Sequence, residues 1–243
     1  MKIDYALTAC DSNPEYYEFW PLIAKVWKEY IGIEPMLIFI GDEIPKEISE
    51  CPYGEVIQVS PFKGISTASQ SQFIRLWYPK MLTDKTIITT DIDMFPLSKW
   101  YFKDQIKNLD DDIFVMLGMR EDWYNICYNV AKGSTFQSIL DLDGDFETIM
   151  KTFYDRISKK PDMNMWFADE VYLTEKIKAY KGDNVKRIIR GAPNRIDRSN
   201  WNYNSGMVKA SMYYDSHSLR PYKKHKQQID NLLNLLWTDS DHI

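Results

Sequence analysis

The sequence predicts an α/β fold in which a mainly parallel central sheet is flanked by helices in a single domain. Apolar runs of strand length alternate with segments of helical spacing through the first half, as in parallel sheets that are covered on both faces. The 243 residues are 44% hydrophobic and 27% charged, like an average globular protein, and suffice for one large domain. We therefore expect residues 1–243 to fold as one unit.

Local signals place the elements along the chain. Short β-branched and aliphatic runs predict strands, whereas apolar residues three or four positions apart predict helices. The expected strands are Ile3–Ala9, Met36–Ile40, Val56–Val59, Thr86–Thr90, Ile113–Leu117, Ile126–Val130, Val185–Ile189 and Met207–Tyr213. The expected helices are Tyr17–Tyr30, ended by Gly32, then Ser66–Leu82, Phe136–Ile157 with a break near Asp143-Gly144, Trp166–Tyr180 and Ile229–Trp237.

Composition excludes several classes of protein. No apolar stretch reaches the roughly 18 residues that a membrane-spanning helix needs. Asp4 lies where a signal peptide needs an apolar run. Cys10, Cys51 and Cys127 are odd in number and widely spaced, so they predict neither a disulfide framework nor a zinc site. We expect a cytoplasmic protein without a membrane span, in the host cytoplasm if a virus encodes it.

The charge is unevenly distributed along the chain. The formal net charge of -5 argues against nucleic acid as a partner. Residues 176–226 nevertheless hold thirteen basic and three acidic residues, a local charge of +10 that leaves -15 for the rest. An acidic body with a basic C-terminal third suits a protein that binds a compact anion such as a phosphate, although a solvated basic face has the same composition.

The sharpest chemical feature is Asp91-Ile92-Asp93. Asp-x-Asp by itself is uninformative here, because it recurs in loop-like stretches at Asp110/Asp112, Asp141/Asp143, Asp143/Asp145 and Asp239/Asp241. Only Asp91 and Asp93 follow a strand that looks buried, and ligands bind at the carboxyl ends of strands in such sheets. Two carboxylates there can hold a divalent cation that bridges a diphosphate, or they can close a turn by local hydrogen bonds.

The stretch around this pair resembles a known family. Phe73-Ile74-Arg75-Leu76 and Pro79 lie on an expected helix, and the strand Thr86–Thr90 then leads into the Asp pair. This order is similar to the signature of glycosyltransferases with the Rossmann-like GT-A fold, and most similar to family 8, which includes glycogenin and bacterial galactosyltransferases. The resemblance implies a hexosyltransferase that uses Mn²⁺ or Mg²⁺, a UDP-sugar donor and a glycan or other hydroxyl acceptor.

The resemblance also implies roles for individual residues. Asp91 would contact the nucleotide ribose and share the metal, with Ile92 beside it, and Asp93 would be the firm metal ligand. Arg75 would approach the donor sugar or its pyrophosphate, unless it is a surface residue of its helix. The family's loop for the uracil base and ribose corresponds here to Thr8, Ala9, Cys10 and Asp11.

Weaker matches concern the acceptor side and the third metal ligand. Asp169-Glu170 resembles the family's Asp-Gln pair near the reacting sugar, with Glu in place of Gln. Glu170 would be a nucleophile or hold an acceptor hydroxyl, or both acids are ordinary helix N-terminal residues. Among His217, His225 and His242, we expect His217 to be the third metal ligand, since a neutral imidazole beside carboxylates suits manganese.

Two further segments resemble the family less closely. Arg220-Pro221-Tyr222 is similar to the family's Lys-Pro-Trp, and Arg220 would neutralise the leaving diphosphate. The distance in sequence from His217 to Arg220 is shorter than the family usually shows. Asn204–Met207 resembles an Asn-Ser-Gly strand of the family but follows the Asp169 segment instead of preceding it, and Tyr128–Gly133 is the alternative for that position.

We therefore expect a transferase with a nucleotide-sugar-binding lobe, 1–98, and an acceptor and catalytic lobe, 99–243. The family likeness favours retention of the anomeric configuration, whereas inversion would need one carboxylate base such as Asp169 or Glu170. A nucleotidyltransferase is the alternative enzyme, although no Gly-rich phosphate loop follows the first strand. A non-catalytic nucleotide- or carbohydrate-binding module is the remaining alternative.

Overall fold

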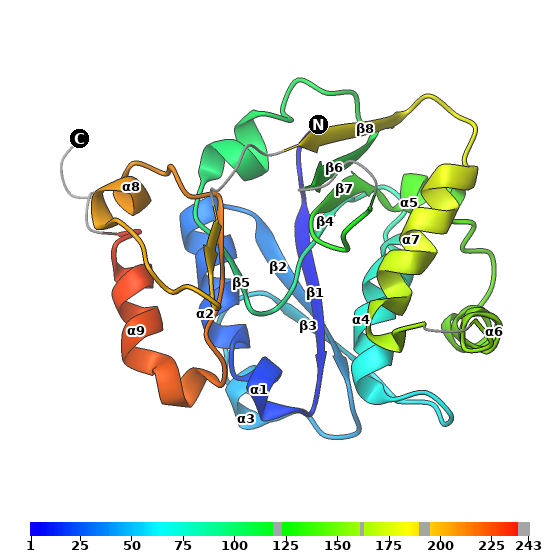
Figure 1. The fold of residues 1–243 in the computed structure, drawn as a ribbon, viewed down its shortest axis with the longest axis horizontal. Coiled ribbons are helices and arrows are strands. Elements are labelled where there is room, and N and C mark those ends of the chain that lie inside the picture. The colour runs from blue at the N-terminus through cyan, green and yellow to red at the C-terminus, as the bar shows by residue number, and fades with distance from the viewer. Residues whose placement is uncertain (119–122, 161–162, 190–194, 238–243) are drawn as a thin grey trace.

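The computed structural model describes residues 1–118, 123–160, 163–189 and 195–237; Arg190, Asp239, Asp241 and His242 lie outside these ranges. Within them, a seven-stranded sheet has the order β3-β2-β1-β4-β7-β6-β8 (Figure 1). All neighbouring strands pair in parallel except at β7, which is antiparallel to both β4 and β6. The strands are β1 (Tyr5–Asp11), β2 (Glu34–Ile40), β3 (Glu55–Val59), β4 (Thr86–Thr89), β6 (Phe114–Gly118), β7 (Asn129–Lys132) and β8 (Val185–Ile189). The expected α/β fold with a mainly parallel sheet is confirmed.

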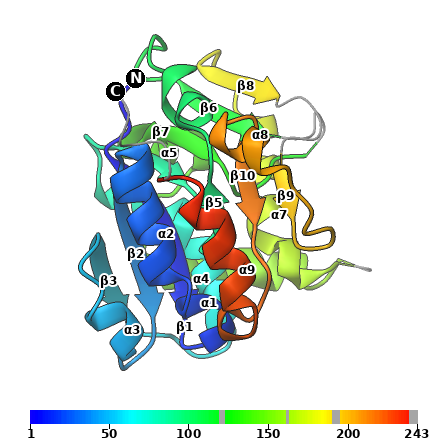
Figure 2. The same ribbon diagram turned by 90° about the vertical axis from the view of Figure 1, so that its left-hand side faces the viewer.

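Helices cover both faces of this sheet. On one face lie α2 (Trp20–Lys25), the π-helical turn Val26–Ile31 that follows it, and α9 (Tyr222–Asn234), with α2 and α9 side by side in Figure 2. Gly32 ends this first helical segment in the left-handed region, at φ +76°. The other face is covered by α4 (Thr67–Trp77), α5 (Gly133–Leu140), α6 (Phe146–Ile157) and α7 (Ala168–Ala179). Shorter helices are α1 (Pro14–Tyr17), α3 (Lys46–Ser49) and α8 (Ser205–Lys209).

The sheet divides the core into two apolar layers because its side chains alternate. Along β2, Leu37 and Phe39 face the layer beneath α2 and α9, whereas Met36, Ile38 and Ile40 face the layer beneath α4 to α7. All five side chains are almost completely buried. A strand that is buried on both faces has no polar alternation, which is why these strands appear in the sequence as continuous apolar runs.

A second, three-stranded sheet brings the C-terminal third to the end of β4. Its order is β5-β10-β9, formed by β5 (Met94–Pro96), β10 (Asp215–His217) and β9 (Arg195–Asp197). The register places His217 opposite Met94 on one side and Asp197 on the other. The Ser218 amide also donates to the Asp93 carbonyl at 2.8 Å. Residues more than a hundred positions apart in the chain are thereby fixed against each other.

Two sequence-based expectations in the C-terminal third are wrong. Residues 205–209 form helix α8 and not part of a strand over Met207–Tyr213, because the Asn204 side chain caps that helix by accepting from the Met207 amide at 3.1 Å. The Asn-Ser-Gly match at Asn204–Met207 is therefore not a strand, whereas the alternative segment forms β7. The closing helix starts at Tyr222 instead of Ile229. Its first turns are largely polar and exposed, so the apolar pattern in the sequence does not reveal them.

Packing beneath α4 should depend strongly on Phe73. Its ring is fully buried and contacts the rings of Phe146, Phe153, Tyr154 and Tyr172. We expect Phe73→Ala to lower the free energy of unfolding by about 3–5 kcal/mol, because it removes these contacts and leaves a cavity. For a chain of this size the melting temperature would fall by roughly 10 °C in calorimetry.

Met81→Ala is the control for this substitution. Met81 is 59% exposed, so its truncation should change the stability by less than about 0.5 kcal/mol. Equal melting temperatures for the two variants would contradict the assignment of Phe73 to the core.

Candidate functional site

The carboxyl ends of β1 and β4 open into a cavity of about 330 Å³. It is lined by residues from both halves of the chain. Its charged and polar side chains are those of Asp11, Tyr16, Ser71, Gln72, Arg75, Asp91, Asp93, Asn125, Asp169, Glu170, Arg195, Arg198, His217 and Arg220. Four arginines and five carboxylates thus converge on one space, so the cavity carries strong charges of both signs.

Nearly all the residues singled out from the sequence line this cavity. They are Ala9, Cys10, Asp11, Arg75, Asp91, Ile92, Asp93, Asp169, Glu170, His217 and Arg220. Thr8 is the exception: it is buried within β1 and does not line the cavity. Asp11 is fixed at the rim, because its carboxylate accepts hydrogen bonds from the Asn13 amide at 3.1 Å and the Thr67 hydroxyl at 2.8 Å.

Arg75 connects three elements beneath the cavity. Its guanidinium is buried, pairs through Nη1 with Asp91, and pairs through Nη2 with Asp169 at 3.2 Å. Nη1 also donates to the Thr90 carbonyl at 3.2 Å. Burial would lower the pKa of Arg75, but the two carboxylates outweigh it and raise that pKa. The side chain is therefore a permanent buried cation and not a surface residue of its helix.

Asp169 has an unusual protonation equilibrium. Burial raises the pKa of its carboxyl to about 7, even though the Arg75 charge opposes that shift. The carboxyl lies at the start of α7, where its own side chain accepts from the Glu170 amide at 2.9 Å. A cavity carboxyl that titrates near neutral pH can exchange a proton with a bound group.

Glu170 accepts three hydrogen bonds from one loop. Its carboxylate accepts from the Trp123 indole N–H, from the Asn125 side-chain amide at 3.1 Å and from the Ile126 backbone amide at 3.3 Å. These donors come from the loop before β7, which is tied to β4 because the Thr89 hydroxyl donates to the Ile126 carbonyl at 2.6 Å. Glu170 therefore fixes the loop on one wall of the cavity while its side chain remains in the lining.

Asp93 lies at the centre of a basic cluster. Its Oδ2 atom is 3.0 Å from Arg198 Nη1, 3.5 Å from His217 Nε2 and 3.5 Å from Arg220 Nε. Burial would raise the pKa of Asp93, but these neighbours outweigh it and lower that pKa. His217 is in turn held from its other ring nitrogen, since Nδ1 is 3.4 Å from Asp197 Oδ2.

The donors present suit a divalent metal in chemical type. Asp91, Asp93 and His217 line the same cavity, and manganese binds both carboxylate and imidazole ligands. Asp93 and His217 already lie within 3.5 Å of each other, so one ion can contact both. Across the described ranges, however, no three His, Cys, Asp or Glu side chains are gathered tightly enough to form a complete metal site. Asp91 is instead paired with Arg75.

Two arginines in the cavity were not singled out from the sequence. Arg195 forks onto the buried Asp215, with Nε–Oδ1 at 2.9 Å and Nη2–Oδ2 at 2.6 Å, and so anchors β9 to β10. Arg198 follows three residues later and reaches Asp93. The basic excess of residues 176–226 was the available signal, but it could not separate these two from the solvated lysines.

Comparison with known proteins identifies the fold. No protein-family model matches the sequence, and no curated protein sequence matches it. Among solved structures, the chain is similar to the galactosyltransferase LgtC in complex with donor and acceptor sugar analogues, at a TM-score of 0.54 and 12% identity over 96% of this chain and 95% of that one. At this low identity the structural likeness shows the fold alone, which is an α/β fold of the GT-A glycosyltransferase type.

Two longer glycosyltransferases show the same fold. GlyE from Streptococcus pneumoniae TIGR4 matches 98% of this chain at a TM-score of 0.51 and 14% identity, and the match spans 61% of GlyE. The bifunctional WbbM matches 96% of this chain at a TM-score of 0.52 and 9% identity, over 50% of its own length. The chain thus spans about half to three fifths of these two proteins.

The raised pKa of Asp169 should appear as a pH dependence of stability. The folded protein binds this proton more tightly than the unfolded chain, so the resulting stability is fully present below about pH 4 and is lost as the pH rises through 7. Relative to Asp169→Asn, the wild-type free energy of unfolding should fall by up to about 2 kcal/mol between about pH 5.5 and 7. Urea unfolding at a series of pH values measures this difference.

Asp155→Asn provides the matched control. Asp155 is an exposed acid on α6, so its curve should run parallel to the wild type. A parallel curve for Asp169→Asn as well would show that Asp169 is already ionised throughout that range.

Proposed function

We propose that this protein is a glycosyltransferase that moves a hexose-type sugar from a nucleoside diphosphate donor, UDP-sugar by preference, to a hydroxyl of a glycan or other acceptor. The observation that carries the proposal is the convergence of Asp91 and Asp93 with the basic residues of β9, β10 and Arg220 around one cavity. In addition, the fold is that of known glycosyltransferases.

On the donor side, the loop after β1 would hold the nucleoside through Ala9, Cys10 and Asp11, which line the cavity beside the Asp91 segment. A manganese or magnesium ion held by Asp91, Asp93 and His217 would neutralise charge on the diphosphate. Arg220 lies at the same point, with Nε 3.5 Å from Asp93 Oδ2, so its guanidinium can bind the leaving phosphate oxygens. Such preorganised charge is often the largest catalytic contribution.

On the acceptor side, Asp169 and Glu170 would position the reacting hydroxyl. Trp166 and Phe167 immediately precede them, line the cavity and are 49% and 44% exposed, which suits the apolar face of a sugar. In the proposed reaction the bond from the anomeric carbon to the diphosphate oxygen breaks, the acceptor oxygen bonds that carbon with retention, and the acceptor proton passes to the leaving phosphate. Holding both partners in one cavity supplies the proximity.

The proposal extends to organisation and location. Residues 1–98 would form the nucleotide-sugar-binding lobe, and residues 99–243 the acceptor and catalytic lobe. Within the described residues, no helix has the length and apolar character needed to cross a bilayer. We assign the reaction to the cytoplasm as part of the same proposal.

Thermal unfolding in the presence of nucleotides tests the donor site. With UDP at about 100 times its dissociation constant and manganese, the protein gains about 2.7 kcal/mol, which for this size corresponds to a melting temperature roughly 5–10 °C higher. GDP, CDP and TDP should raise it less. Asp93→Ala should abolish the rise, because it removes the proposed metal ligand.

Asp155→Ala, which removes an exposed carboxylate on α6, should leave the nucleotide effect unchanged. A rise with nucleoside triphosphates in place of diphosphates would favour the nucleotidyltransferase alternative. If no nucleotide stabilises the wild-type protein, the proposed donor site is wrong.

A further inference from the structure

Arg198 and Arg220 are held less firmly than the other two arginines of the cavity, since within the described ranges each forms an ion pair with Asp93 alone and is partly exposed. Arg75 is buried between two carboxylates, and Arg195 is forked onto Asp215, so both guanidinium groups are committed to the fold. Arg198 is 28% exposed in its side chain and, among the described residues, makes a single ion pair through Nη1 to Asp93. Most of its five N–H donors therefore remain available to a ligand.

The position of Arg198 gives its side chain access to both parts of the site. It lines the main cavity and also the adjoining hollow formed by Glu15, Asp197, Ser199, His217, Leu219 and Arg220. It directly follows Asp197, the last residue of β9, and β9 is anchored to β10 through Arg195. The backbone at Arg198 is thus anchored next to β9, and the residue borders both hollows.

The Asp93 carboxylate is shared by three basic neighbours. The contacts from Arg198, His217 and Arg220 all run to one atom of Asp93, Oδ2. A divalent ion bound at Asp93 would compete with Arg198 for the same oxygen and would repel its guanidinium. A diphosphate at the same place would offer Arg198 new acceptors, since planar guanidinium groups bind phosphate oxygens with two parallel hydrogen bonds.

We infer that Arg198 is a diphosphate-binding residue that guards Asp93: it pairs with this carboxylate when no donor is present and moves its hydrogen bonds to the donor's diphosphate when a metal takes Asp93. This inference deepens the proposed function and rests on it. Arg198 then weakens the binding of the metal alone and strengthens the binding of the nucleotide. Metal and diphosphate binding are coupled through one side chain, which disfavours a metal-loaded site without a donor.

Two titrations on Arg198→Ala test this coupling, because the expected effects have opposite signs. Binding of Mn²⁺ alone, followed by the paramagnetic resonance signal of the free ion, should become at least 3-fold tighter at the site that Asp93→Ala removes. Binding of UDP with Mn²⁺, followed by calorimetry, should become roughly 10-fold weaker or more, as expected for loss of charged hydrogen bonds. Arg198→Lys should lie between, since it keeps the charge but loses the fork.

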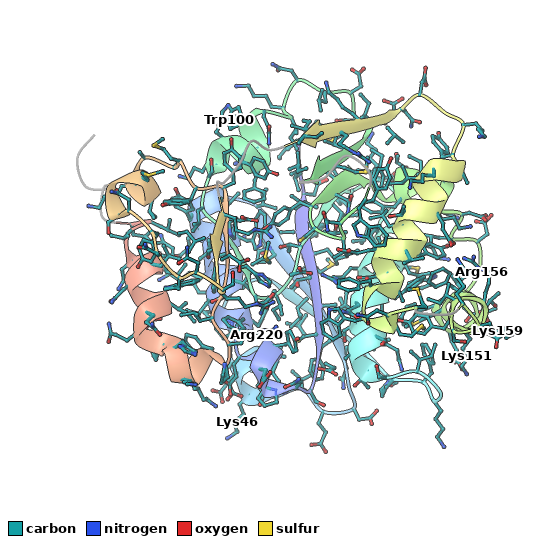
Figure 3. The ribbon with its side chains drawn as sticks, in the orientation of Figure 1. Lys46, Trp100, Lys151, Arg156, Lys159 and Arg220 are labelled. Carbon is teal, nitrogen blue, oxygen red and sulfur yellow. The ribbon has the colours of Figure 1, made fainter. Side chains whose placement is uncertain are left out.

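Arg156→Ala is the matched control, since Arg156 lies at α6 on the far side of the molecule from Arg220 in Figure 3 and pairs with Glu175. Neither titration should change in this variant. Circular dichroism and ligand-free melting of Arg198→Ala establish that the fold is intact.

The outcomes separate this inference from the proposed function. If the wild type binds UDP and Arg198→Ala binds it equally well, or binds Mn²⁺ no more tightly, the guarding role is wrong while the donor site stands. If the wild type binds UDP equally in a chelator and Arg198→Ala weakens that binding, Arg198 is a diphosphate ligand that does not guard a metal site. If the wild type binds no UDP at all, both proposals fail.

Discussion

The buried Arg75 guanidinium is the interaction on which the rest of the site depends. It joins α4 to the end of β4 through Asp91 and to the start of α7 through Asp169. Removal of either carboxylate would leave a buried charge without one of its partners, which is costly in a protein interior. The two walls of the cavity therefore keep their relative positions through one side chain, and the contact between the Phe73 and Tyr172 rings also joins α4 to α7.

The second constraint is the small sheet that returns the chain to the end of β4. Its central strand, β10, carries His217 on one side of Asp93, and its outer strand, β9, leads directly into Arg198. The register of these three-residue strands places His217, and the residues that follow them, Arg198 and Arg220, near Asp93. A shift by one residue would move every side chain to the opposite face.

The electrostatics of the cavity follow from these two constraints. One buried arginine is balanced by two carboxylates, whereas at the other end one carboxylate, Asp93, is surrounded by Arg198, Arg220 and His217. The first arrangement is held in balance within the fold, whereas Arg198 and Arg220 share the single Asp93 carboxylate, an excess of one positive charge among these three groups. A bound diphosphate, with or without a metal, would neutralise that excess of positive charge.

The sequence alone determined the fold class for local reasons, and its resemblance to a known family indicated most residues of the candidate site. Continuous apolar runs predicted strands buried on both faces, and the position of Asp91 and Asp93 after such a run predicted the edge where the cavity lies. Only the tertiary structure decided which basic residues of the C-terminal third face this edge. Arg198 and the solvated lysines have the same local sequence character, and the strand pairing of β9 and β10, a contact between distant segments, is what separates them.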